Sequence, residues 1–153
     1  MMREILFRGK RTDNGEWVEG FLFYQTIDGE NACCIGTEPL SANDYSEILG
    51  DWVEVVPETV GQFTECTDRN GTRIFGGDIF KYESSSKVTY GVVEYRTDYK
   101  EHRTHNPAGY VIRWVTGDLR EDLPFWCGEH SKAFVVGNIF DNPKLMEVEE
   151  NDL

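Results

Sequence analysis

The sequence predicts a mainly β protein, a β-rich α+β fold of short antiparallel strands with little helix. Apolar and polar residues alternate over many short segments, and this period of two is typical of half-buried strands. Clusters of Gly, Asn, Asp and Ser separate these segments at short intervals, as in chains built from hairpins. No long segment repeats apolar residues at helical spacing. We therefore expect about nine or ten short strands.

The first half of the chain begins with a predicted hairpin. Alternation from Ile5 to Arg8 predicts a short strand, and a turn at Thr12 to Gly15 leads into a second strand at Trp17 to Tyr24. The other elements expected in this half are a turn at 28–30, a strand at 32–35, one or two helical turns or an irregular loop at 41–49, and a strand at 52–56.

The stretch from Thr59 to Asp78, TVGQFTECTDRNGTRIFGGD, predicts a hairpin that joins the two halves. Its Asn70-Gly71 pair favours a tight turn, because both residue types tolerate positive φ. Gly76-Gly77-Asp78 then turns the chain toward the next apolar run.

The second half predicts a small SH3-like curled barrel. Its strands are expected at 79–83, 90–95, 110–115 and 133–140, with a short apolar patch at 124–127. The segment 96–109 is almost devoid of apolar residues, so we expect a long exposed connection there.

Composition limits the class of protein further. With 153 residues and 39% hydrophobic content, the chain is long enough and apolar enough for a folded domain with its own core. No apolar run approaches the roughly 20 residues of a membrane helix, and the first residues lack an apolar signal core. We therefore expect a cytoplasmic protein without a membrane role, whose four cysteines are thiols.

Charge is distributed unevenly along the chain. Thirteen of the 28 acidic residues lie between Thr12 and Asp68, where there is no Lys or Arg. The remaining fifteen acids match the fifteen bases, so this segment carries the whole net charge of -13. This polarity favours contact between subunits or with a basic partner, and it disfavours broad contact with nucleic acid backbones.

Four motifs occur in order along the chain, MREILFRGKR, NGEWVEG, VVPETVGQFTECTDRNGTRIFGGDIF and VVGNIFDNPKLM. Together they resemble the YopX family of bacteriophage and prophage proteins. A typical central motif of that family is closer to QFTGLKDKNGKEIYEGDIV, so Glu65-Cys66 replaces a Gly-Leu pair and Gly76 replaces an acidic residue. The resemblance implies a largely β fold and a bacterial host cell, and it assigns no catalytic residue.

The expected domain organisation follows from this resemblance. Residues 1–146 form one YopX-like domain, with an acidic N-terminal half (1–58), the central hairpin (59–78) and a barrel-like half (79–146), and an acidic tail follows at 147–153. The residues that match the family motif have a structural interpretation, glycines for backbone geometry and Asn70 and Asp78 for turn hydrogen bonds. These motif residues are Gly61, Gln62, Asn70, Gly71, Gly77 and Asp78.

Catalytic and metal chemistry find little support in the sequence. Cys127 with His130, and His102 with His105, are ligand types at short spacing, but a structural zinc site usually has two such pairs. The sequence also lacks a Gly-x-Ser-x-Gly nucleophile elbow. We expect no catalytic residues, no metal and no cofactor.

Two functional hypotheses remain. The first is a non-enzymatic protein-interaction or assembly module that forms a homo-oligomer and contacts a host or phage protein. The alternative is a nucleic-acid-related accessory protein, which either binds single strands weakly through the aromatic and basic residues of the second half or mimics nucleic acid with its acidic first half. Direct nucleic-acid binding is disfavoured, because acids nearly match bases in the second half.

Overall fold

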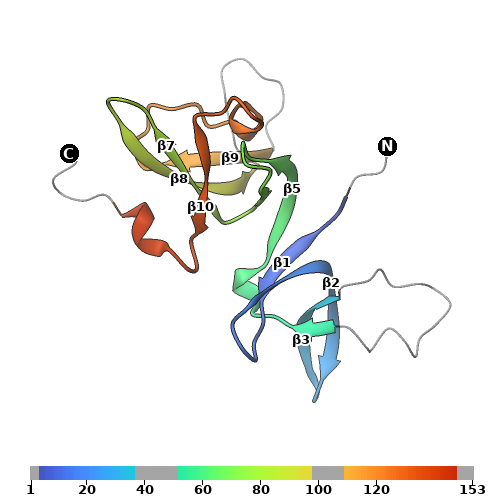
Figure 1. Cartoon of the computed structure of the whole chain (residues 1–153). Helices are drawn as coiled ribbons and strands as arrows, with labels where there is room; N and C mark the ends of the chain where they lie inside the picture. Colours follow the sequence, from blue (N-terminus) through green and yellow to red (C-terminus); the bar gives the residue numbers. More distant parts are fainter. Residues whose placement is uncertain (1–3, 37–51, 98–108, 148–153) are drawn as a thin grey trace. The chain divides into compact units, whose positions relative to one another are not determined.

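The computed structural model describes residues 4–36, 52–97 and 109–147. The chain divides into two compact units, Met1–Phe63 and Thr64–Leu153, and the division falls inside the predicted central hairpin. Strands in two antiparallel sheets are the main element, and three short 3-10 helices are the helical elements of the described residues (Figure 1). The predicted mainly β fold with little helix is confirmed.

The element bounds lie close to the predicted strands. In unit 1 they are β1 Phe7–Lys10, β2 Trp17–Ile27, β3 Glu30–Gly36, β4 Trp52–Glu54 and the 3-10 helix η1 Pro57–Thr59. The strand β5 Gly61–Thr67 contains the division between the units. In unit 2 they are β6 Arg73–Phe75, β7 Asp78–Glu83, β8 Val88–Arg96, β9 Gly109–Trp114, η2 Leu123–Trp126, β10 Ala133–Asn138 and η3 Pro143–Met146.

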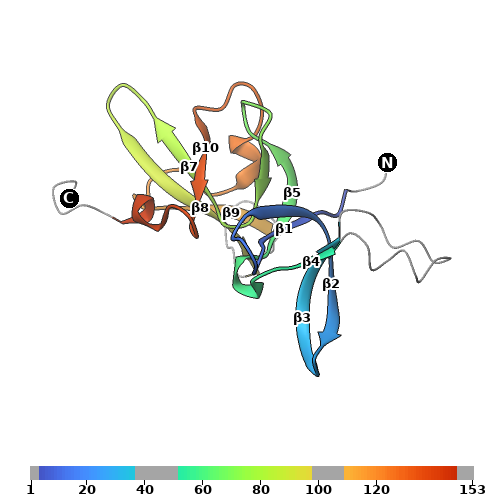
Figure 2. The same cartoon turned by 60° about the horizontal axis from the view of Figure 1, so that its bottom comes forward.

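Unit 1 is built around the long β2–β3 hairpin. The strands of this unit follow the order β4-β3-β2-β1-β5, and Figure 2 shows β2 and β3 as a twisted ribbon with β4 beside its open end. Asp28 and Gly29 connect β2 to β3 with φ values of 51° and 82°. Positive φ at both central residues is the geometry of a type I′ turn, which matches the twist of the flanking strands.

The core of unit 1 is formed by side chains on one face of this sheet. Cys33, Ile35 and Val55 are buried, and they pack against Phe7, Val18, Leu22, Val53 and Val60. At Gly20, a Cβ atom would lie 2.0 Å from the backbone oxygen of Gly36. This position therefore needs glycine, because the neighbouring strand approaches so closely.

Unit 2 contains a four-stranded antiparallel sheet. Its order is β10-β7-β8-β9, and the β7–β8 hairpin stands out in Figure 1. β6 pairs with β5 in the other sheet. The pairs between described strands do not close either sheet into a barrel, while a curled sheet, as predicted, is compatible with this arrangement.

The core of unit 2 lies against this sheet and includes the predicted apolar patch. Its buried residues come from β6, β7, β8, β9, η2 and β10. The predicted patch at 124–127 therefore overlaps the short helix η2, which contributes to this core. Those residues are Ile74, Phe80, Val93, Ile112, Trp114, Leu123, Trp126 and Ala133.

The turn between β5 and β6 differs from the expected tight Asn-Gly hairpin. The loop spans 68–72, with hydrogen bonds from Gly71 N to Asp68 O (3.0 Å) and from Asp68 N to Thr72 O (2.9 Å). Gly71 has a φ of 79°, whereas Asn70 does not have positive φ. A two-residue type I′ turn requires positive φ at both positions, so the predicted turn type was wrong.

Some predicted segments lie outside the described residues. They are the segment 41–49, most of the connection 96–109, and all but the first residue of the tail 147–153. None of the helices in the described ranges has the length and apolar character that a membrane span needs.

Candidate functional site

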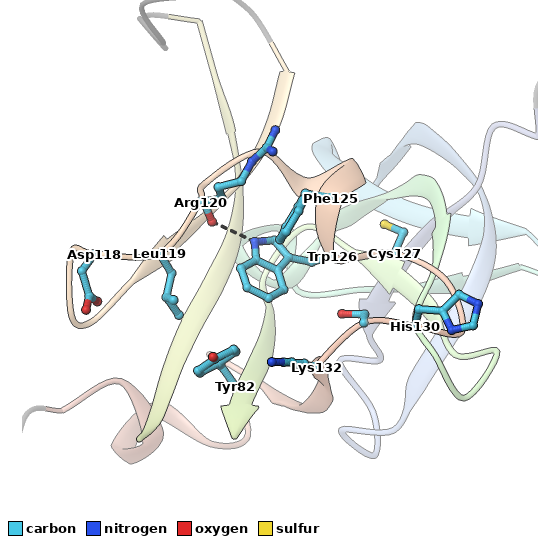
Figure 3. Close-up of a pocket in the computed structure, with 10 residues that line it drawn as sticks. Tyr82, Asp118, Leu119, Arg120, Phe125, Trp126, Cys127, His130 and Lys132 are labelled. Carbon is cyan, nitrogen blue, oxygen red and sulfur yellow. Dashed lines mark hydrogen bonds between the residues drawn. The ribbon is translucent and has the colours of Figure 1, made fainter. Parts of the chain in front are cut away.

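A pocket of about 530 Å³ opens on unit 2, beside η2 (Figure 3). Its lining comes from β7, from the segment between β9 and η2, and from η2 and the residues after it. The lining residues include Tyr82, Asp118, Leu119, Arg120, Phe125, Trp126, Cys127, His130 and Lys132.

Aromatic rings form the centre of the pocket wall. The Trp126 ring packs edge to face against Tyr82 (centroids 5.7 Å apart), Trp114 (5.2 Å) and Phe125 (4.9 Å). The indole N–H groups of Trp114 and Trp126 both donate to the backbone oxygen of Arg120, each at 2.8 Å. These bonds satisfy two amphipathic side chains and fix the orientation of their rings.

Phe125 differs from its neighbour Trp126 in exposure. Trp126 is 5% exposed and belongs to the core, whereas Phe125 is 51% exposed. The Arg120 guanidinium lies 4.4 Å from the centre of the Phe125 ring, close enough for a cation–π contact. The pocket therefore presents a large, partly exposed apolar ring on a rigid support.

The charged groups around the pocket are mostly paired. Arg120 donates to both carboxylate oxygens of Asp122, at 2.8 and 2.9 Å. Lys87 pairs with Asp118, and this contact lowers the pKa of the Asp118 carboxyl. Within the described part of the chain, the exposed Lys132 side chain has no hydrogen bond or ion pair.

Two thiols meet at one side of the pocket. Cys127 lines the pocket, its thiol donates to the Leu123 oxygen at 3.3 Å, and Cys66 of β5 lies close to it. The neighbouring Cys127 thiol is the main cause that lowers the pKa of the Cys66 thiol to about 7. The same contact, followed by burial, raises the pKa of Cys127.

The six motif residues do not line this pocket. Gly61 and Gln62 lie in β5, opposite Arg8 and Phe7 of β1. Gly77 has a φ of 92°, donates to Val93 O (2.8 Å) and accepts from Ile139 N (3.0 Å).

The polar motif residues differ in their bonding. The buried Asp78 carboxylate accepts the Phe75 N–H at 2.7 Å. In the 68–72 turn, the carboxylate belongs to Asp68, which accepts from the N–H groups of Asn70 and Thr72 at 2.9 Å each. Asp68 therefore has the hydrogen-bonding role expected of Asn70. Spacing alone did not indicate this, although an Asp before Asn-Gly is a common turn signal.

The candidate metal ligands differ in where the structure places them. Cys127 and His130 both line the pocket, whereas His102 and His105 lie outside the described residues. Among the residues at 4–36, 52–97 and 109–147, no three His, Cys, Asp or Glu side chains come together as a metal site would require.

The fold and pocket define a mainly β protein of two units with an aromatic pocket in unit 2. A family model described as YopX protein matches residues 6–147, and the chain belongs to this family.

Among solved structures, the chain is similar to the crystal structure of protein EF1440 from Enterococcus faecalis. The two share 21% identity, with a TM-score of 0.44, over 94% of this chain and 99% of that chain. No curated protein matches.

Proposed function

We propose that this YopX-family protein is a non-enzymatic assembly module that self-associates through the aromatic pocket of unit 2. The observation that carries the proposal is the pocket itself, where half-exposed Phe125 shares the lining with Lys132, whose ammonium group has no partner among the described residues. Exposed aromatic anchors in a rigid pocket with a charged border are typical of interaction hot spots.

The proposed occupant is the β2–β3 hairpin of a second copy. Tyr24 of β2 is 71% exposed, the most exposed of the large hydrophobic side chains described. The same hairpin carries Asp28 and Glu30 at its turn and has no Lys or Arg. An acidic hairpin with an exposed ring is complementary to an aromatic pocket with an available ammonium group.

Self-association through this contact can form a closed dimer. Each copy supplies the β2–β3 hairpin and the aromatic pocket, so two such contacts related by a two-fold axis would complete a dimer. We place this assembly in the cytoplasm of a bacterial host cell, as a phage- or prophage-encoded protein, on the basis of the YopX family membership. The same surface would allow an acidic segment of a host or phage protein to compete.

The test is size exclusion coupled to light scattering over a range of concentrations. We expect wild type to exceed the monomer mass of 17.6 kDa, and Phe125→Ala and Tyr24→Ala each to shift it toward the monomer. Tyr95→Ala is the matched control, because Tyr95 is also exposed (58%) but lies in β8, outside both surfaces. A wild-type monomer at high concentration, or an unchanged oligomer in both variants, would contradict the proposal.

Single-strand binding gains no specific support from the face that carries Tyr95. Tyr95 and Tyr110 pack edge to face there, 5.3 Å apart. The nearby basic side chains already form ion pairs with carboxylates. Arg96 pairs with Glu94 and Glu121, and Arg113 pairs with Glu94. We therefore do not propose single-strand binding at this face.

A further inference from the structure

Cys66 and Cys127 come from distant parts of unit 2 and lie in contact. Cys66 is in β5 and Cys127 directly follows η2. The Gly128 N–H donates to the Thr67 oxygen at 3.2 Å, which holds the two backbones together one residue beyond the thiols. Both side chains pack against the same core and are only partly buried. Bonding between the sulfurs requires such close backbone approach.

The other two thiols of the chain have a different environment. Cys33 and Cys34 are adjacent in β3 and buried, with 3% and 0% exposure. Burial is the main cause that raises the pKa of both thiols. Neighbouring residues of a strand point to opposite faces, so these thiols do not face each other. They provide an internal control for reactivity.

We propose that Cys66 and Cys127 form a redox site, which closes to a reversible intramolecular disulfide when the protein meets a peroxide. The Cys66 thiolate attacks a peroxide oxygen, so an S–O bond forms, the O–O bond breaks, and hydroxide leaves. The Cys127 sulfur then attacks the Cys66 sulfur, so the S–S bond forms and the S–O bond breaks. The leaving hydroxide takes the Cys127 proton as water. The first hydroxide takes up the proton that the Cys66 thiol released, so two thiols lose two electrons and one hydrogen peroxide becomes two water molecules.

The local electrostatics suit Cys66 to the role of attacking thiolate. The neighbouring Cys127 thiol is the largest influence on its pKa, which falls to about 7. Thr64 also stabilises the thiolate by hydrogen bonding, whereas burial and the Glu65 carboxylate oppose it. On the other side, Cys66 and the Asp68 carboxylate both help to keep the proton on Cys127. Reactivity follows the thiolate fraction and access, and both favour Cys66 over Cys33 and Cys34.

This inference does not depend on the proposed self-association. Because Cys127 lines the pocket, the disulfide would tie the end of η2 to β5 at the pocket wall. Oxidation would thereby limit the movement of the segment that carries Phe125 and Trp126.

The experiment uses the full-length, fully reduced protein treated with hydrogen peroxide under native conditions. Remaining thiols are alkylated after unfolding, and the peptides are mapped by mass spectrometry. We expect one crosslinked pair, Cys66 with Cys127, which a dithiol reductant reverses, while Cys33 and Cys34 remain alkylated. Persistence of both Cys66 and Cys127 as free thiols, or pairing of either with Cys33, Cys34 or a second chain, would overturn the proposal.

Single variants separate the two chemical steps. In Cys127→Ser, the sulfenic acid of Cys66 has no resolving thiol, so a dimedone adduct should accumulate on Cys66. In Cys66→Ser, neither the crosslink nor a comparable adduct on Cys127 should form. Cys33→Ser is the matched control and should crosslink like wild type. An adduct on Cys127 instead of Cys66 would refute the assigned order of attack.

Discussion

Glu65 has a backbone conformation that is rare for its residue type. Its φ is 70°, in the region that costs an L-residue roughly 1–2 kcal/mol. The typical family motif has glycine at this position, so the Glu65-Cys66 departure noted in the sequence coincides with a strained residue. The strain lies next to the thiol proposed for redox chemistry.

We predict that Glu65→Gly stabilises unit 2 by about 1 kcal/mol, because the relief of strain exceeds the entropic cost of glycine. Urea denaturation would measure the change. The control is Glu83→Gly in β7, an exposed strand residue without positive φ, which should destabilise the protein by about 0.5–1 kcal/mol. A loss of stability in Glu65→Gly would contradict the interpretation.

Asp68 links a local turn to a distant strand. One carboxylate oxygen accepts from Asn70 and Thr72, and the other accepts from Val135 N of β10 at 3.0 Å. The side chain is 3% exposed, so its removal would leave buried N–H groups without partners. Such groups are costly because they have lost their water as well.

We predict that Asp68→Ala destabilises the protein by about 3 kcal/mol. Asn70→Ala should cost less than about 0.5 kcal/mol, because Asn70 is exposed and contributes its backbone N–H. Thermal unfolding followed by circular dichroism would compare the two variants. Equal costs would mean that the turn depends on Asn70 as the motif first suggested.

The Cys66 thiol should respond to pH near neutrality. Its alkylation rate by iodoacetamide should rise with a midpoint near pH 7. In Cys127→Ala the midpoint should move upward, because the neighbouring thiol that stabilises the Cys66 thiolate is lost. Peptide mapping of alkylation at several pH values would measure both midpoints, with Cys34 as the slow internal reference. An unchanged midpoint in the variant would exclude Cys127 as the cause.

The same pKa shifts have opposite consequences for stability. The folded-state pKa of Cys66 lies below the ordinary value of 9.0. The stability that Cys66 adds to the folded state is therefore complete above pH 9 and is lost as pH falls through about 7. The folded-state pKa of Cys127 is raised. The stability that Cys127 adds to the folded state is therefore complete below pH 9 and declines as pH rises further. The thiol pair therefore favours the folded state increasingly between about pH 7 and 9, and the gain stops above that range.

At the scale of elements, the contact between β8 and β9 depends on one small residue. Gly91 lies opposite Trp114. A Cβ atom there would lie 2.4 Å from Ile112 Cγ2 and 2.8 Å from Trp114 Cε3. These distances are far below van der Waals contact, and both neighbours belong to the buried core.

We predict that Gly91→Ala destabilises the protein by about 2–3 kcal/mol, because overpacking shifts the β9 side chains. Gly117→Ala is the matched control, since a Cβ atom at that position would meet no other atom within 4 Å and its φ is not positive. Its effect should be within about 0.5 kcal/mol. Urea denaturation of both variants, with Trp fluorescence as the readout, would compare them. A tolerated alanine at Gly91 would mean that the β8–β9 contact adjusts easily.

At the scale of the whole molecule, charge asymmetry governs the proposed assembly. The residues between Thr12 and Asp68 carry the entire net charge of -13, and the proposed pocket offers the ammonium group of Lys132. Attraction between exposed charges of opposite sign weakens as salt shortens the Debye length.

We therefore predict that raising salt from about 0.05 to about 0.5 M weakens self-association roughly tenfold. Sedimentation equilibrium would measure the dissociation constant at each salt concentration. In Lys132→Gln the same series should show a smaller change, while Lys144→Gln, a change outside the pocket, should behave like wild type. Association that strengthens with salt would point to an apolar contact without the charge pairing.

Sequence patterns predicted the local elements well. Alternation placed β2, β3, β7, β8 and β9 within a few residues of their observed bounds, because period-two burial is a local property. The turn type at Asn70-Gly71 was wrong, because Asp68 and Thr72 close a longer loop there. The candidate pocket was not predicted, although the patch at 124–127 and His130 contribute to its lining. Its residues come from β7, the β9–η2 segment and η2, which only the fold brings together.

The sequence by itself determined the mainly β class, the position of the turns, the acidic bias of the first half and the YopX family. All of these depend on residue types at short spacing or on ordered motifs. The tertiary structure alone decided that Cys66 meets Cys127, that Asp68 bonds to β10 and that two indoles share the Arg120 oxygen. Periodicity indicates which face of a strand is buried, but strand order and register decide which distant side chains share that face.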